Sequence, residues 1–196
     1  YFSTDEVFGP ADRGEIYNEW DRYDSRNPYA ASKAGGEEMC LAFRNTYRLP
    51  IRIVHCMNVF GERQHQEKFI PATIRKILRE ERICIHSNAG LTRPGSRYYI
   101  HASNVASAIG FLLHYRHEAD AIKYNIVGEK EVDNLELVTQ IAGVMGRKFD
   151  YELVDFHSSR PGHDLRYALS DHLMRSLGWS PPQHFDESLA RVVNWY

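Results

Sequence analysis

Apolar and polar positions alternate along the chain in two patterns, one typical of helices and the other of short buried strands. Leu49-Pro50 ends the first helical pattern, and the mostly apolar run 51–55 that follows predicts a buried strand. Gly146 is predicted to cap a helix at its C-terminal end. Helices are predicted over 29–47, 69–80, 104–117, 134–145, 171–177 and 185–195, and strands over 51–55, 83–85, 123–127, 151–154 and 167–169. This alternation predicts an α/β protein.

The segments between these elements are polar and rich in turn-forming residues. Residues 10–27 contain many Pro, Gly, Asp, Asn and Arg residues and are predicted to form a long loop, and 88–95 is a turn-rich stretch. No internal repeat or low-complexity tract interrupts the pattern. The chain therefore has no interior segment that is predicted to be a flexible linker.

Composition narrows the class of protein. A length of 196 residues with 43% hydrophobic residues is enough for the core of one domain or a domain and a half. A net charge of −2 offers no basic surface for nucleic acid or membrane lipids, and no apolar run approaches the ~20 residues of a membrane span. Cys40, Cys56 and Cys84 are scattered, so we predict neither disulfides nor a metal site but reduced, mostly buried thiols.

The first 33 residues bring together side chains suited to proton transfer. Tyr29 and Lys33 are four residues apart on a predicted helix and so share one face, where the ammonium would lower the pKa of the phenol and make it a base. Thr4 can hydrogen-bond the same substrate alcohol. Asp5 and Glu6 are then available for further proton transfers, which suggests an elimination in addition to an oxidation.

Each of these pieces also has a structural interpretation. Tyr29 and Lys33 could be a solvated surface pair, which is common for residues four apart on a helix. The segment Ser3-Thr4-Asp5-Glu6 also matches a capping box with Ser3 as the N-cap, although Gly9 and Pro10 disfavour a helix there. The combination of both motifs is more specific than either one.

Several further motifs resemble those of the extended short-chain dehydrogenase/reductases that act on nucleotide sugars. Within the NAD-dependent epimerase/dehydratase family, the chain is most similar to the dTDP-glucose 4,6-dehydratases. Epimerases and decarboxylases of this superfamily share the Tyr/Lys pair but usually lack the acid pair after the threonine, so Thr4-Asp5-Glu6 favours a dehydratase. The resemblance covers nearly the whole chain and rests on residues 3–9, 28–34, 58–61, 67–71, 96–101 and 160–167.

The resemblance implies the C-terminal part of a doubly wound Rossmann-type parallel sheet with a smaller substrate-binding α/β domain. Residues 1–57 and 98–127 would belong to the NAD-binding domain, and 58–97 and 128–196 to the nucleotide-sugar-binding domain. The family's glycine-rich phosphate loop is not found near the start of the chain, so we expect weak NAD binding by these residues alone. A cytoplasmic homodimer is a further expectation from the family.

The resemblance also implies residues that bind the substrate. Arg97 and Arg160 suit the diphosphate, because a guanidinium can bind phosphate oxygens bidentately, although surface ion pairs are the common alternative. The family's base-stacking aromatic corresponds to His86, which stacks less strongly than tyrosine and leaves the nucleobase open. The expected substrate-binding residues are Asn58, Lys68, His86, Arg97, Arg160 and His163.

The expected reaction follows from these groups. Tyr29, assisted by Lys33 and Thr4, would take the proton of the sugar O4 hydroxyl while NAD accepts the C4 hydride. Glu6 would then take the C5 proton and a protonated Asp5 would protonate the departing 6-hydroxyl, giving a 4-keto-6-deoxy sugar. The alternatives are a 4-epimerase, a UDP-glucuronate decarboxylase, and a non-catalytic relative that binds sugar nucleotides.

Overall fold

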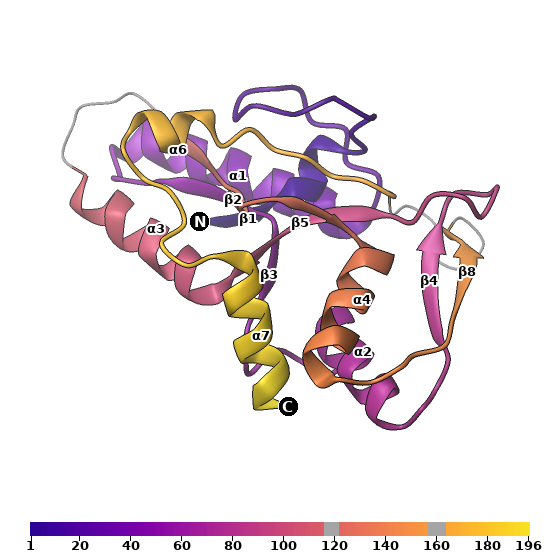
Figure 1. Ribbon diagram of the computed structural model, residues 1–196. Helices are drawn as coiled ribbons and strands as arrows, with labels where there is room; N and C mark the ends of the chain where they lie inside the picture. The colour runs from indigo at the N-terminus through magenta and orange to yellow at the C-terminus, as the bar shows by residue number, and fades with distance from the viewer. Residues whose placement is uncertain (116–121, 157–163) are drawn as a thin grey trace.

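A three-stranded parallel sheet forms the first part of the molecule (Figure 1). The computed structural model describes residues 1–115, 122–156 and 164–196. The strands are β1 (Phe2–Thr4), β2 (Ile53–Cys56) and β6 (Lys123–Ile126), in the order β1-β2-β6. Both strand pairs are parallel, so their carboxyl ends meet at one edge of the sheet. In open parallel sheets this edge is where ligands bind.

The two faces of this sheet differ in chemistry. Val54, Tyr124 and Ile126 pack in an apolar cluster with α3 (Ala102–His114) and α6 (His172–Ser176). The intervening residues point to the opposite face because successive strand residues alternate. That face carries polar side chains and is covered by α1 (Pro28–Tyr47) (Figure 1).

The helix α1 begins at a well-formed cap. The side chain of Asn27 accepts a hydrogen bond of 2.8 Å from the backbone N–H of Ala30, and Pro28 occupies the first helical turn. The helix ends at Arg48, which adopts a left-handed conformation with φ of 57°. The cap fixes where the first helical turn, including Tyr29, begins.

The second part of the molecule is built from two small sheets and three helices. β3 (Asn58–Phe60) pairs parallel with β5 (Ser96–His101), which pairs antiparallel with β7 (Glu131–Asp133). β4 (Ile83–Ser87) and β8 (Tyr151–Asp155) form a separate parallel pair on the side of the molecule away from β1 and β2 (Figure 1). The largest apolar cluster draws buried residues from β3, β4, β5 and β7 and from α2 (Phe69–Leu78), α4 (Asn134–Met145) and α7 (Phe185–Trp195).

The predicted helices are confirmed with small changes at their ends. α3 begins two residues earlier than expected and ends at His114, and α4 is capped by Gly146 in a left-handed conformation as predicted. The predicted strand over 167–169 is wrong. Leu169 forms only an isolated bridge to Tyr17, because its neighbours run along the 10–27 loop rather than along a strand. The short strands β3, β5 and β7 were not among the predicted elements; two of the three have only three residues, too few to show a period.

Two smaller expectations also need correction. The start of the chain does form a helical turn, the 3₁₀ helix η1 (Asp5–Phe8), but its N-cap is Thr4 rather than Ser3. All three cysteines are free as expected, yet Cys84 is exposed and Cys40 and Cys56 are only partly buried. Among the helices that the structure describes, none is both long enough and apolar enough to cross a membrane. The division into cofactor and substrate domains stays a prediction.

Candidate active site

The carboxyl end of β1 carries the first catalytic candidates. Thr4 ends the strand and caps η1: its Oγ1 accepts a hydrogen bond of 3.4 Å from the N–H of Glu6 and donates one of 3.0 Å to Oδ1 of Asp5. Gly9 ends this turn with φ of 79°, and a Cβ there would lie 2.6 Å from the carbonyl oxygen of Asp24. The tight turn therefore presents Thr4, Asp5 and Glu6 together at the ligand-binding edge of the sheet.

Asp5 is the most unusual group at this edge. The residue is 4% exposed, and its Oδ2 is buried without a hydrogen-bond partner among the described residues. Burial raises the pKa of this carboxyl to about 6, with a further rise from Glu6, against a lowering influence of Arg97 and of the Thr4 hydrogen bond. Asp5 can therefore hold a proton close to neutral pH, as its expected role as an acid requires.

Glu6 lies beside Asp5 in a different environment. It is only partly buried, and its Oε2 accepts a hydrogen bond of 2.9 Å from Nδ2 of Asn27. Asn27 also caps α1, so one side chain joins Glu6 to the helix that carries Tyr29. Sequence reasoning missed Asn27, although an Asn before a Pro at a predicted helix start is a capping signal.

Tyr29 and Lys33 share one face of α1 as predicted. The Lys33 ammonium lies 6.0 Å from the centre of the Tyr29 ring and donates a hydrogen bond of 3.0 Å to the carbonyl of Phe2. The expected lowering of the phenol pKa is wrong for the chain as the structure shows it. Partial burial raises the pKa of the Tyr29 phenol. The nearby carboxyl groups of Glu6 and Asp5 raise it further, whereas the hydrogen bond with Thr4 lowers it.

Arg97 has a different set of partners from the expected ones. Its guanidinium donates to the carbonyls of Ser96 (2.7 Å), Asp164 and Leu165, and its central carbon lies 4.6 Å from the centre of the Tyr167 ring. These carbonyl bonds take the place of the surface ion pair that is common for an arginine. Arg97 holds the backbone at 164–165 against β5, and its diphosphate contact stays a prediction.

Arg97→Ala is expected to lower the free energy of unfolding by about 1.5–3 kcal/mol, the usual contribution of hydrogen bonds made by a charged group. The loss of this cation should also raise the pKa of Asp5 further, because Arg97 opposes the effect of burial. Urea denaturation would measure the first effect. An Arg97→Ala protein as stable as its parent would show that these carbonyl contacts contribute little.

The remaining substrate-binding candidates are spread over the second part of the molecule. Asn58 begins β3 and its side chain hydrogen-bonds the Tyr99 phenol. Lys68 is exposed before α2, and His86 lies in β4 with its ring edge-on to Phe156 at 5.7 Å. Arg160 and His163 lie outside the described residues. Of the four candidates within the described residues, Arg97 lies close enough to Asp5 to lower the pKa of its carboxyl group.

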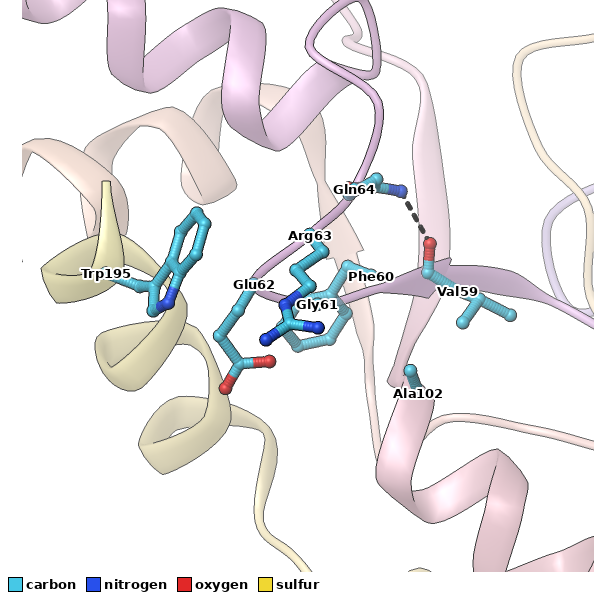
Figure 2. A pocket seen from close by; sticks show the side chains of 8 residues that line it. All are labelled: Val59, Phe60, Gly61, Glu62, Arg63, Gln64, Ala102 and Trp195. Carbon is cyan, nitrogen blue, oxygen red and sulfur yellow. Dashed lines mark hydrogen bonds between the residues drawn. The ribbon is translucent and has the colours of Figure 1, made fainter.

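A separate cavity of about 640 Å³ lies between the β3–α2 connection, the start of α3 and the end of α7. Figure 2 shows the Trp195 ring on one side of it and the Glu62 and Arg63 side chains on the other, with Gln64 donating a 2.7 Å hydrogen bond to the carbonyl of Val59. Within the described part of the chain, no candidate catalytic or substrate-binding residue lines this cavity. The buried Asp5 carboxyl and the Tyr29–Lys33 pair lie instead at the Thr4 edge of the sheet, which is the candidate active site.

Comparison with known proteins identifies the family of the chain. The family model described as GDP-mannose 4,6 dehydratase matches residues 1–192. The chain belongs to this family. Among curated relatives, a probable dTDP-glucose 4,6-dehydratase from Sinorhizobium fredii is 32% identical over the whole chain and 56% of its own length. A low-salt glycan biosynthesis protein from Haloferax volcanii is 34% identical over 99% of the chain and 60% of its own length.

Solved structures place this dehydratase-family chain among Rossmann-type enzymes. The dTDP-glucose 4,6-dehydratase of Bacillus anthracis, crystallised in complex with NAD, superposes with a TM-score of 0.85 at 32% identity, covering 100% of this chain and 60% of that one. A UDP-glucuronic acid 4-epimerase from Bacillus cereus superposes with a TM-score of 0.86 at 19% identity, covering 99% and 59%, which shows a shared fold. The chain thus spans somewhat more than half the length of the relatives it matches.

Proposed function

We propose that the full-length protein containing this chain is an NAD-dependent nucleotide-sugar 4,6-dehydratase. Its substrate would be a nucleoside-diphosphate hexose similar to dTDP-glucose, and its product the 4-keto-6-deoxy sugar nucleotide. The observation that carries the proposal is Asp5, a buried carboxyl group beside Thr4 and Glu6 whose Oδ2 has no partner among the described residues. An oxidation or a 4-epimerisation needs no such acid, whereas elimination of a hydroxyl group does.

The residues at this edge fit a nicotinamide cofactor. Thr4, Tyr29 and Lys33 lie at the carboxyl end of a parallel sheet, the position at which Rossmann-type folds bind dinucleotides. Tyr29 is 51% exposed and so is open to a ligand on that side. Bound NAD would supply the hydride acceptor for C4 of the sugar and the hydride donor for C6. The B. anthracis relative was crystallised with this cofactor.

The protein's own residues would move three protons. Tyr29 Oη acts as the phenolate and takes the proton of the sugar O4 hydroxyl; the hydrogen bond with Thr4 and the positive charge of Lys33 near the ring favour this ionised form. A Glu6 carboxylate oxygen takes the proton from C5, which the 4-ketone makes acidic. Asp5 gives its proton to the departing 6-hydroxyl, which leaves as water.

The substrate contacts are part of the same proposal. Arg97 and Arg160 would bind the diphosphate, with Asn58, Lys68, His86 and His163 around the nucleotide. The carbonyl bonds of Arg97 use three of the five N–H groups of its guanidinium, two on Nη1 and one on Nη2, and the other two can donate to a phosphate. A cytoplasmic homodimer is the expected state of the full-length enzyme.

A 4-epimerase is the second candidate, because the fold is shared with a UDP-glucuronic acid 4-epimerase. A UDP-glucuronate decarboxylase and a non-catalytic relative that binds sugar nucleotides complete the set of candidates. The products distinguish them: loss of water, inversion at C4, loss of CO₂, or no change. The origin of the hydrogen at C5 gives the sharpest separation.

With the full-length enzyme in D₂O, the 4-keto-6-deoxy product is expected to carry deuterium at C5. Glu6 would remove the C5 proton and exchange it with solvent before a proton is returned there, whereas a 4-epimerase leaves C5 untouched. Glu6→Gln should suppress both elimination and exchange, on the order of 10² to 10⁴-fold. Mass spectrometry and proton NMR of the product measure both effects.

Glu15→Gln provides the matched control, since this exposed carboxylate lies on the 10–27 loop and accepts a hydrogen bond from the backbone N–H of Asp12. It should leave exchange and turnover unchanged. A 4-keto-6-deoxy product without deuterium at C5, or a Glu6→Gln enzyme that exchanges normally, would remove Glu6 from the mechanism. An inverted C4 centre with no loss of water would favour the epimerase.

A further inference from the structure

A row of polar side chains crosses the interior of the β1-β2-β6 sheet. Ser3, His55 and Asn125 are successive register partners, so their side chains lie side by side on the face toward α1. His55 and Asn125 are fully buried and Ser3 is 6% exposed. Nδ1 of His55 lies 2.9 Å from Oδ1 of Asn125. Nothing in the reaction proposed above uses this row.

Asn125 fixes the orientation of the histidine. Its Nδ2 donates to the carbonyls of Tyr17 and Ser170, both at 3.3 Å, so its oxygen must face His55. Nδ1 of His55 therefore carries a proton, and the ring turns Nε2 toward α1. The row ends at a single residue of that helix, Glu37.

Glu37 is the point where the row meets α1. It is fully buried, and its carboxylate oxygens lie 3.2 and 3.3 Å from Nε2 of His55. Ser3 and the Tyr23 phenol both donate hydrogen bonds to it. The Lys123 ammonium lies 3.1 Å from Oε2 and donates a 2.6 Å bond to Tyr23. All three strands and the 10–27 loop thus converge on one carboxylate.

Burying the charged groups of such a network costs desolvation free energy that an apolar core would not cost. Burial of Glu37 alone would raise its pKa, yet hydrogen bonds from His55, Ser3 and Tyr23 and the charge of His55 hold the pKa at about 2. Apolar side chains of similar volume often give equal or greater stability than a buried ion pair. Hydrogen bonds are directional, so a buried polar network whose members are all bonded adds a specific orientation to the packing of the helix on the sheet.

The same helix face carries the proposed base. Tyr29, Lys33 and Glu37 follow one another at four-residue intervals, so Glu37 lies about 12 Å along the axis from Tyr29. Ser3, which bonds Glu37, immediately precedes Thr4, which bonds Tyr29. Gly36 permits close contact here, since a Cβ would lie 2.1 Å from the Tyr1 hydroxyl. The helix is thus hydrogen-bonded to β1 through Tyr29, Lys33 and Glu37, with Tyr29 at the reacting end.

We propose that Glu37 is a positioning residue that, through Ser3, Tyr23, His55 and Lys123, sets the rotation of α1 and thereby holds Tyr29 against Thr4. This inference rests on the proposed function, in which Tyr29 is the base. It assigns no contact between Glu37 and the substrate. Loss of the network should therefore change the oxidation step more than it changes substrate binding.

Glu37→Gln in the full-length enzyme is expected to slow single-turnover oxidation at C4 by on the order of 10-fold or more, while KM for the nucleotide sugar changes less than about threefold. Hydrogen exchange of the peptide 28–47 should rise in the variant even without substrate. Leu137→Ala, in the apolar core around α4, is the control for a general loss of stability. It should lower the melting temperature without a selective loss of oxidation.

A double-mutant cycle with Tyr29→Phe decides the point. If Glu37 acts through Tyr29, Glu37→Gln should cost little further in the Tyr29→Phe background. Equal losses in both backgrounds would overturn the inference. Should Glu37→Gln fail to fold, Tyr23→Phe removes one bond of the network and enters the same cycle. If the Tyr29→Phe enzyme keeps full activity, Tyr29 is not the base and the proposed function is wrong. If Tyr29→Phe is impaired but Glu37→Gln is not, the proposed function stands and only the inference about Glu37 is wrong.

Discussion

Asp5→Asn is expected to slow loss of the 6-hydroxyl by on the order of 10² to 10⁴-fold, the usual effect of removing a general acid. Oxidation at C4 should be much less affected, because Asp5 enters only the elimination. The variant should therefore accumulate the 4-keto sugar nucleotide with its 6-hydroxyl intact. Rapid quenching followed by mass spectrometry separates this species from the dehydrated product.

The pH dependence of kcat/KM for the parent enzyme should also show that Asp5 acts as the acid. The elimination needs Asp5 protonated, and its pKa is about 6, so kcat/KM should fall as the pH rises above about 6. This basic limb should be absent from the residual activity of Asp5→Asn. A limb that persists unchanged in the variant would belong to another group.

Asp5 also links activity to stability. Its pKa rises from 3.8 in the unfolded chain to about 6 in the fold, so the folded state holds the proton more tightly. Stability should then fall as the pH rises from about 4 to about 6 and stay lower above that range, by on the order of 3 kcal/mol. Asp5→Asn should lose this dependence and unfold at higher urea concentration than the parent at pH 8.

Asp150→Asn is the matched control, because Asp150 is exposed and pairs with Arg82 at the surface far from β1. It should change neither the product distribution nor the pH profile. An Asp5→Asn enzyme that eliminates water at the parental rate would contradict the assignment of the acid. In that case the epimerase would become the better candidate.

Tyr29→Phe is expected to lower the rate of C4 oxidation by on the order of 10² to 10⁴-fold, because the variant lacks the phenol that hydrogen-bonds Thr4 and serves as the proposed base. Every later step depends on the 4-ketone, so elimination and C5 exchange should fall with it. Single-turnover absorbance of the reduced nicotinamide measures the first step directly. Substrate KM should change little, since the ring remains.

Tyr47→Phe tests whether loss of any phenol from α1 would have the same effect. Tyr47 lies at the far end of the same helix and is 65% exposed. Its substitution should leave oxidation unchanged. Equal rates for Tyr29→Phe and the parent would show that the base lies elsewhere.

Local sequence patterns determined most of the helices and which residues make up the proposed catalytic group. Pro50, the caps at Asn27 and Gly146, and the helical period around them fix where α1 and α4 begin or end, because these effects act within a few residues. Tyr29 and Lys33 had to share a face once their segment was helical. The motif Thr4-Asp5-Glu6 suggested the proposed chemistry because three functional groups in sequence need no long-range contact to lie together.

The tertiary structure alone decided how these groups behave. The pKa of Asp5 depends on burial and on Arg97, which lies 92 positions away in the chain, and the Tyr29 pKa rises where the local i,i+4 pair predicted a fall. Arg97 binds backbone carbonyls that no local pattern predicts.

Nothing in the local sequence distinguishes Glu37 from other polar residues of α1. Its partners Ser3 and His55 are brought together by the register of β1 and β2. Sequence by itself determined which side chains could react and on which elements they lie. Their burial, pKa values and orientation came from contacts between distant segments, because desolvation and hydrogen bonding depend on what the completed fold places around each group.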